Sequence, residues 1–92
     1  MENKEYSYPL DLDWSTEEIL HVMSFYQAIE IGYTEGILAG KLSEAYKDFK
    51  DIVPSKAEEK TIFKDFEKVS GMAPFKLIKQ LKDSEVDQII KP

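Results

Sequence analysis

The chain has 92 residues, which suits one domain, and a formal net charge of −6. It has no cysteine, and this excludes disulfides, thiolate metal ligands and a cysteine nucleophile. All 12 basic residues are lysine, so no arginine can grip a phosphate or a guanine with two hydrogen bonds, and the acidic balance argues against a nucleic-acid partner.

Residues 1–14 are predicted to form an extended arm. Pro9 favours an extended conformation in the residue before it. After it, Leu10, Leu12 and Trp14 alternate with aspartates, a period of two that places the apolar side chains on one side. Because a strand here has no evident partner strand, we expect the arm to lie over the helices, anchored by these three side chains.

The first helix is predicted to begin after Ser15 and to run to about Glu35. Ser15 and Glu18 fit a capping box, in which each side chain accepts a hydrogen bond from the backbone N–H of the other residue. Gly36 suits the position just past the end of the helix.

This helix is apolar almost all round. One face holds Ile19, Val22, Met23, Tyr26, Ile29 and Tyr33, and Leu20, Phe25 and Ile31 extend it. Such a helix is normally buried at the centre of a small fold or at an oligomer interface. We expect the other helices and the arm to wrap it, and a homodimer is one assembly that fits.

Three further helices are predicted from their start and stop signals. They cover about residues 40–51, 55–69 and 74–82. Pro54 stops the first of them, Ser55 and Glu58 fit a second capping box, and Pro74 suits the first turn of the last helix. The apolar side of the last helix is supplied by Phe75, Leu77, Ile78 and Leu81.

The fold class predicted from these elements is all-α. Residues 15–82 form the core of a single domain, a small irregular array of three to four helices with the extended N-terminal arm. Residues 83–92 are mostly polar, and we expect them to form a short helical turn or a flexible tail.

Glu30 falls inside the apolar face of the first helix. A carboxylate there should be paired, or its pKa should rise. The structural interpretation is a buried polar contact to a lysine or to a tyrosine hydroxyl, such as that of Tyr26 or Tyr33. The functional interpretation is a site carboxylate, and we prefer the first.

Lysines recur every four residues along the predicted third helix, at Lys56, Lys60, Lys64 and Lys68. The plain interpretation is a solvated face. The alternative is a stripe that meets an acidic surface. That surface would belong either to a protein partner or to residues 1–35 of the same chain, which hold eight acidic residues and one lysine, a net charge of −7.

The remaining polar constellations are weak. Asp11 and Asp13 lack the glycine and glutamate of a calcium-binding loop. His21, the only histidine, lies away from the main core face and is interpreted as a surface or interface residue, and Ser24 has no third group to complete a triad. We therefore expect no catalytic residue, no cofactor and no metal site.

The chain is expected to be cytoplasmic and to have no membrane partner. Its charged start, residues 1–5, is not followed by the apolar stretch of a signal peptide. No apolar run approaches the roughly 20 residues that span a bilayer.

Five motifs follow one another in a specific order along residues 6–80. They are Tyr8-Pro9-Leu10-Asp11, Asp13-Trp14-Ser15-Thr16-Glu17-Glu18, Phe25-Tyr26-Gln27-Ala28-Ile29-Glu30, Val53-Pro54-Ser55-Lys56-Ala57-Glu58-Glu59-Lys60 and Ser70-Gly71. In this the chain resembles the YktA-like family, small uncharacterised proteins of low-GC Gram-positive bacteria. The resemblance implies an irregular all-helical array of three or four helices, and it implies no activity and no functional residues.

The function predicted is that of a non-enzymatic helical module acting through contacts with a protein partner whose identity the sequence does not give. The aromatic arm residues Tyr6, Tyr8 and Trp14 support it, because aromatic side chains are common anchors at interfaces. The alternative is a small ligand-binding protein or enzyme with a pocket around Glu30 and its neighbouring tyrosines.

Overall fold

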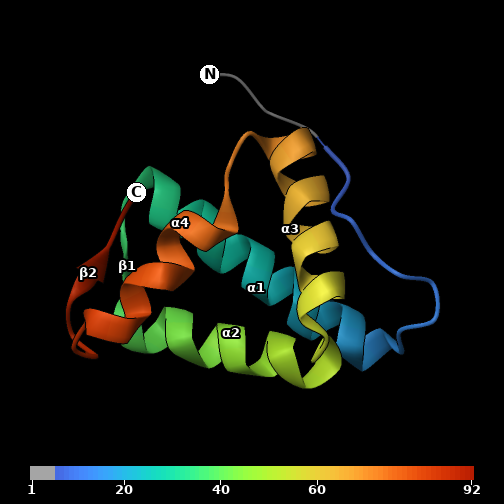
Figure 1. The fold of residues 1–92 in the computed structure, drawn as a ribbon, viewed down its shortest axis with the longest axis horizontal. Helices are drawn as coiled ribbons and strands as arrows, with labels where there is room; N and C mark the ends of the chain where they lie inside the picture. The colour runs from blue at the N-terminus through green and yellow to red at the C-terminus, as the bar shows by residue number, and fades with distance from the viewer. Residues whose placement is uncertain (1–5) are drawn as a thin grey trace.

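Four α-helices, one short 3-10 helix and a two-stranded sheet make up the computed structural model, which describes residues 6–92 (Figure 1). In chain order the elements are α1 Thr16–Thr34, β1 Ile37–Leu38, α2 Ala39–Ile52, α3 Lys56–Ser70, α4 Pro74–Ile78, the 3-10 helix η1 Lys79–Asp83 and β2 Ile89–Ile90. The predicted all-α class, an irregular array of helices, is confirmed. Residues 6–14 contain neither helix nor strand, and the first five residues of the predicted arm lie outside the described part.

The predicted capping box of α1 is present. The Ser15 hydroxyl accepts from the Glu18 N–H at 3.1 Å, and the Glu18 carboxylate accepts from the Ser15 N–H at 2.8 Å. These two bonds satisfy backbone donors that a helix start otherwise leaves without partners. They fix the point at which the arm turns into α1.

The predicted place of α1 at the centre of the fold is seen on one of its faces. That face buries Val22, Phe25, Tyr26, Ala28, Ile29 and Gly32. On the opposite face, Leu20 and Ile31 are 57% and 41% exposed. α1 is therefore central on one side and forms protein surface on the other. Neither α1 nor any other helix within residues 6–92 is long and apolar enough to cross a membrane.

Stacked aromatic rings join α1 to α2 and α3. The ring centroid of Phe25 lies 4.6 Å from that of Phe49 on α2 and 5.8 Å from that of Phe63 on α3. Tyr26 stacks on Phe66, with centroids 4.7 Å apart and planes 3° from parallel. In Figure 1, α3 stands upright while α2 runs horizontally beneath it, so these rings hold helices that cross at a steep angle.

Two glycines permit close approaches around the end of α1. A Cβ atom at Gly32 would lie 2.5 Å from Leu77 Cδ1, so α4 packs directly on the backbone of α1. Gly36 has a φ of 90°, as expected for the residue that ends a helix, and a Cβ there would lie 2.6 Å from Ile89 Cγ2. The chain can therefore leave α1, enter β1 at once and remain in contact with β2.

The start of α3 satisfies half of the second predicted capping box. The Ser55 hydroxyl accepts from the Glu58 N–H at 3.3 Å, whereas the reciprocal bond to the Glu58 carboxylate is absent among the bonds of residues 6–92. α3 ends at Gly71 in the left-handed conformation, with a φ of 78°. α4 begins with Pro74 in its first turn, as predicted.

The end of the chain forms a strand where the sequence analysis expected a helical turn or a flexible tail. Ile89 and Ile90 pair antiparallel with Leu38 and Ile37, respectively. Ile90 is fully buried, and Ile89 is half exposed. Successive side chains of a strand point to opposite faces, as these two isoleucines do. A segment of two residues is too short for this alternation to be recognised in the sequence. The tail therefore closes the end of the core beside α4.

Candidate functional site

Glu30 is paired, but with the arm rather than with the residues named from the sequence. The Tyr8 hydroxyl donates to Glu30 Oε1 at 2.9 Å, and the Tyr6 hydroxyl donates to Glu30 Oε2. Burial and the hydrogen bond to Glu30 raise the pKa of Tyr8 to about 12 and raise that of Tyr6 in the same way. Both hydroxyls therefore keep their protons at neutral pH and remain donors to the carboxylate.

The two predicted partners of Glu30 hold other parts of the chain. The Tyr26 hydroxyl donates to the carbonyl oxygen of Pro9 at 2.6 Å and so fixes the middle of the arm. The Tyr33 hydroxyl donates to the carbonyl oxygen of Ala73 and accepts from its N–H, both at 3.1 Å, and so fixes the link between α3 and α4. The predicted contact between Glu30 and a tyrosine hydroxyl is therefore present, but its donors are Tyr6 and Tyr8 instead of Tyr26 or Tyr33.

The arm is anchored by its tyrosines instead of its leucines. The Tyr8 ring centroid lies 5.0 Å from that of Tyr26 and 6.2 Å from that of Phe66. Leu10 and Leu12 are 42% and 97% exposed, so neither is an anchor. A tyrosine can fill the apolar contact and satisfy Glu30 at the same time, which a leucine cannot do.

Trp14 is the one predicted anchor that packs against the core, where it is half-buried. Between the arm and α3 lies an open hollow of about 600 Å³. The apolar side chains of Leu10, Leu12, Trp14 and Ile62 line it together with four carboxylates, those of Asp11, Asp13, Glu58 and Asp65. The hollow is therefore acidic, and none of the lysines within residues 6–92 lines it.

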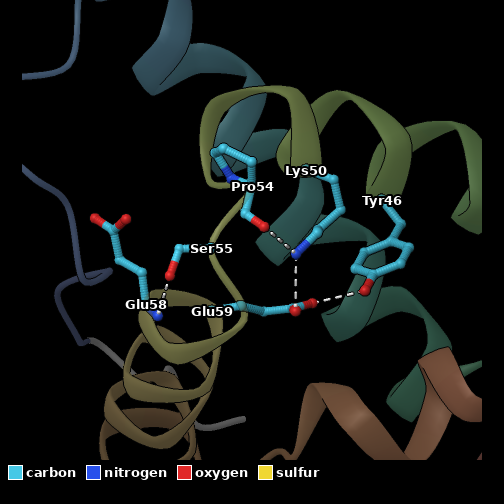
Figure 2. A network of polar contacts seen from close by, with 6 residues as sticks. All are labelled: Tyr46, Lys50, Pro54, Ser55, Glu58 and Glu59. Atoms are coloured by element: carbon cyan, nitrogen blue, oxygen red, sulfur yellow. Dashed lines mark hydrogen bonds and ion pairs between the residues drawn. The ribbon is translucent and has the colours of Figure 1, made fainter.

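A buried carboxylate that the sequence analysis missed joins α2 to α3, as Figure 2 shows. Glu59 is 9% exposed; its Oε1 accepts from Lys50 Nζ at 3.0 Å and its Oε2 from the Tyr46 hydroxyl at 2.6 Å. Lys50 also donates to the carbonyl oxygen of Pro54 at 3.4 Å. Burial, and then the bond to Glu59, raises the pKa of Tyr46.

The signal for Glu59 was present in the sequence. Glu59 precedes Ile62, Phe63 and Phe66 by three, four and seven residues, which is the spacing of one helix face. That spacing places its carboxylate on the core side of α3. Both of its oxygens are occupied by donors from α2, so the network of Tyr46, Lys50 and Glu59 holds the turn between the two helices.

Three of the four predicted lysines line a second groove, between α3 and α4. Its volume is about 640 Å³, and Lys56, Lys60 and Lys64 line it, while Lys68 does not. All four are exposed, and within residues 6–92 none of them forms an ion pair. The predicted pairing of the stripe with the acidic start of its own chain is therefore not seen among residues 6–35.

The rest of this groove is mainly apolar. Phe63 and Pro74 are buried and form its floor, and Tyr46 lies at its end. Phe75, predicted on the apolar side of the last helix, is 61% exposed beside them. The inward positions of α4 are taken by Pro74, Leu77 and Ile78, and the ring of Phe75 falls off that face.

His21 lies beside the carboxylate of Asp48. Its Nδ1 lies 3.6 Å from Asp48 Oδ2, and both side chains are about half exposed. Among the residues that the structure describes, no group of three histidine, aspartate or glutamate side chains could hold a metal ion. The pair bridges the surfaces of α1 and α2.

Comparison with known proteins finds one family and close relatives in bacteria. The family described as "Uncharacterised protein family (UPF0223)" matches residues 5–90. A UPF0223 protein of Bacillus pumilus (strain SAFR-032) is 51% identical over 87 residues, which are 95% of this chain and 98% of the relative. UPF0223 proteins of Staphylococcus aureus (strain bovine RF122 / ET3-1) and Lysinibacillus sphaericus (strain C3-41) are each 48% identical over 87 residues, 95% of this chain and 96% and 92% of the relatives. The resemblance to an uncharacterised family of low-GC Gram-positive bacteria is confirmed.

Proposed function

This chain belongs to the uncharacterised UPF0223 family, and we propose that it is a non-enzymatic module that binds a partner protein in the groove between α3 and α4. The proposed occupant is a segment of the partner in which acidic residues flank an apolar side chain. One observation carries the proposal: Phe75 is 61% exposed on an apolar groove that is also lined by three lysines, none of which forms an ion pair within residues 6–92.

The apolar part of the groove supplies a reason to bind. Covering an exposed phenylalanine ring is worth about 1.5–3 kcal/mol. Aromatic side chains next to a concave floor are frequent centres of binding energy at interfaces. Phe75 beside the floor of Phe63 and Pro74 has that arrangement.

The charges supply a preference for acidic partners. Glu59 and Glu67 also line the groove, but Glu59 is already paired with Lys50. The lysines at 56, 60 and 64 therefore outnumber the one remaining acid. Such a surface attracts negative partners and disfavours positive ones, mainly through the rate of association.

The non-enzymatic part of the proposal follows from where the carboxylates are held. Both oxygens of Glu30 accept from arm tyrosines, and both oxygens of Glu59 accept from α2. A reactant that replaced one of these donors would break a contact that holds the fold. The alternative, a ligand or substrate pocket at Glu30, requires the arm to leave α1.

Binding is proposed to take place in the cytoplasm. The support comes from the composition. One-third of the residues are charged, and the chain has no cysteine that could form a disulfide in an oxidising compartment.

Affinity capture of the tagged chain from its native host, with cross-linking before lysis, tests the proposal. We expect a stoichiometric partner that Phe75→Glu and the double variant Lys60→Glu/Lys64→Glu lose. Val86→Glu is the matched control, because Val86 is 76% exposed and lies outside the groove. A partner retained by all three variants would contradict the proposed surface, and recovery of the bait alone would favour the ligand-binding alternative.

A further inference from the structure

We propose that the chain also binds a second copy of itself, by inserting Leu12 of one copy into the α3–α4 groove of the next. This inference rests on the proposed function, since it gives the same groove an occupant. It adds the chemical pattern of that occupant, an apolar side chain between two aspartates on a tight turn.

Leu12 is displayed on an ordered turn. The Asp13 N–H donates to Asp11 Oδ1 at 2.9 Å, and the Trp14 N–H donates to the Asp11 carbonyl oxygen at 3.1 Å. Leu12 lies between these bonds and is 97% exposed. An aspartate that hydrogen-bonds the backbone two residues on is a common way to stabilise such a turn.

Both ends of the turn are held by the rest of the fold. On one side the Tyr26 hydroxyl donates to the Pro9 carbonyl oxygen at 2.6 Å. On the other side the capping box of Ser15 and Glu18 begins α1. Because the turn is ordered before it binds, little conformational entropy is lost when Leu12 enters a groove.

The turn and the groove carry opposite charges. Asp11 and Asp13 flank Leu12, and the hollow behind the turn adds the carboxylates of Glu58 and Asp65. The groove presents three lysines that have no ion-pair partner in the described part of the chain. The turn therefore matches the groove of another copy in both charge and apolar character, whereas the acidic hollow beside it would repel it.

The two surfaces lie on different faces of α3. Glu58 and Ile62 face the hollow, whereas Lys56 and Lys60 face the groove, and two residues along a helix turn the side chain by about 200°. In Figure 1 the arm passes on one side of α3 and α4 lies on the other. Each copy would then give its turn to one neighbour and its groove to another, a head-to-tail contact that does not close at a dimer by itself.

Sedimentation of the whole chain over a wide concentration range tests the inference. The average mass is expected to rise with concentration, to pass that of a dimer and to fall when the salt concentration is raised. Leu12→Asp and Phe75→Asp should each weaken association by about tenfold or more, since each removes one buried apolar side chain from the contact. Val86→Asp changes an apolar residue whose exposure, 76%, lies between those of Phe75 and Leu12; it lies outside both surfaces, so this change should have no effect.

Mixing the two variants gives the sharper result. Leu12→Asp keeps an intact groove and Phe75→Asp keeps an intact turn, so a mixture should form a mixed dimer that grows no further. A chain that stays monomeric at every concentration, or associates equally well after Leu12→Asp, overturns the inference.

The outcome is separable from that of the proposed function. Leu12→Asp leaves the groove intact and should still capture the partner protein. If the chain does not self-associate, the proposed partner site is unaffected. If instead the partner is still captured by Phe75→Glu, the groove is not the partner site.

Discussion

The two sides of α3 differ in how their polar groups are used. On the arm side, Glu30 and the hydroxyls of Tyr6, Tyr8 and Tyr26 all find partners within the chain, and the rings close over Phe66. On the α4 side, an exposed aromatic ring and lysines that form no ion pair with the described residues face a groove. The difference separates the contacts of Glu30 and the tyrosines, which hold the arm, from the lysines and Phe75, which remain available for binding.

The largest expected change in stability comes from comparing two phenylalanines, one on each side of α3. Phe66→Ala should lower the free energy of unfolding by about 3–5 kcal/mol, because Phe66 is fully buried and stacks on Tyr26. Phe75→Ala should change it by less than about 0.5 kcal/mol, as surface substitutions usually do. Urea unfolding followed by circular dichroism measures both, and similar losses for the two variants would contradict the assignment of Phe75 to a binding surface.

The next effect concerns Glu30. Glu30→Ala leaves two partly buried hydroxyls without their acceptor and should lower the free energy of unfolding by about 2 kcal/mol. Glu30→Gln should cost about half as much, since its amide oxygen can still accept one bond. Glu44→Ala, at an exposed position on α2, serves as the control. If neither Glu30 variant shifts the urea midpoint relative to the control, the arm is not held by this carboxylate.

Alkaline pH should weaken the arm side. The pKa of Tyr8 is raised from 10.0 to about 12, so between these values the unfolded chain has lost a proton that the folded chain keeps. The unfolded state then binds fewer protons, and the free energy of unfolding falls as pH rises from about 10 to 12. Tyr8→Phe should flatten part of this decline in urea titrations between pH 8 and 12. Identical slopes for the two chains would exclude Tyr8 as a contributor.

The smallest expected effect is on the groove side. Lys60→Glu/Lys64→Glu should change the free energy of unfolding by less than about 0.5 kcal/mol, because within residues 6–92 neither lysine forms an ion pair. For the same reason, raising the salt concentration should leave the stability of the unmutated chain nearly flat. Thermal unfolding at low and high salt checks this, and a salt-dependent midpoint that the variant abolishes would show that the stripe is already paired.

The helix ends were predictable because their signals are local. Ser15 and Glu18 form their capping box from residues three apart, and Pro74 needs only its own missing N–H to favour a first turn. Glu30 was also recognisable as a carboxylate on an apolar face. In each case the deciding interaction lies within one or two helix turns.

The partners of these residues were not predictable in the same way. Tyr6 and Glu30 are separated by 24 residues, and only the path of the arm across α1 and α3 brings them together. β2 pairs with a strand more than 50 residues earlier, and a segment of two isoleucines is too short to predict this pairing from the sequence. Glu59 differs from these cases, because its spacing to Ile62, Phe63 and Phe66 alone places it on the core face of α3.

Phe75 shows why the candidate site could not be predicted from the sequence alone. Its position in a helix with Leu77 and Ile78 indicated a core residue, yet α4 has only five residues and presents a narrow inward face. Pro74, Leu77 and Ile78 fill that face, which leaves the Phe75 ring beside the lysines of α3. Lysine spacing alone could suggest a charged stripe, but the apolar groove next to it depends on where α4 packs.

The claim that the α3–α4 groove is the binding surface is tested most directly by a photocross-linking amino acid placed at single exposed positions in living cells. Phe75 would be compared with Leu20 on the outer face of α1 and with Val86 beyond η1, which are 57% and 76% exposed. We predict one strong adduct at Phe75 whose cross-linked segment, sequenced by mass spectrometry, carries acidic residues around an apolar side chain. Adducts that are equal at all three positions, or strongest at Leu20, would contradict the account.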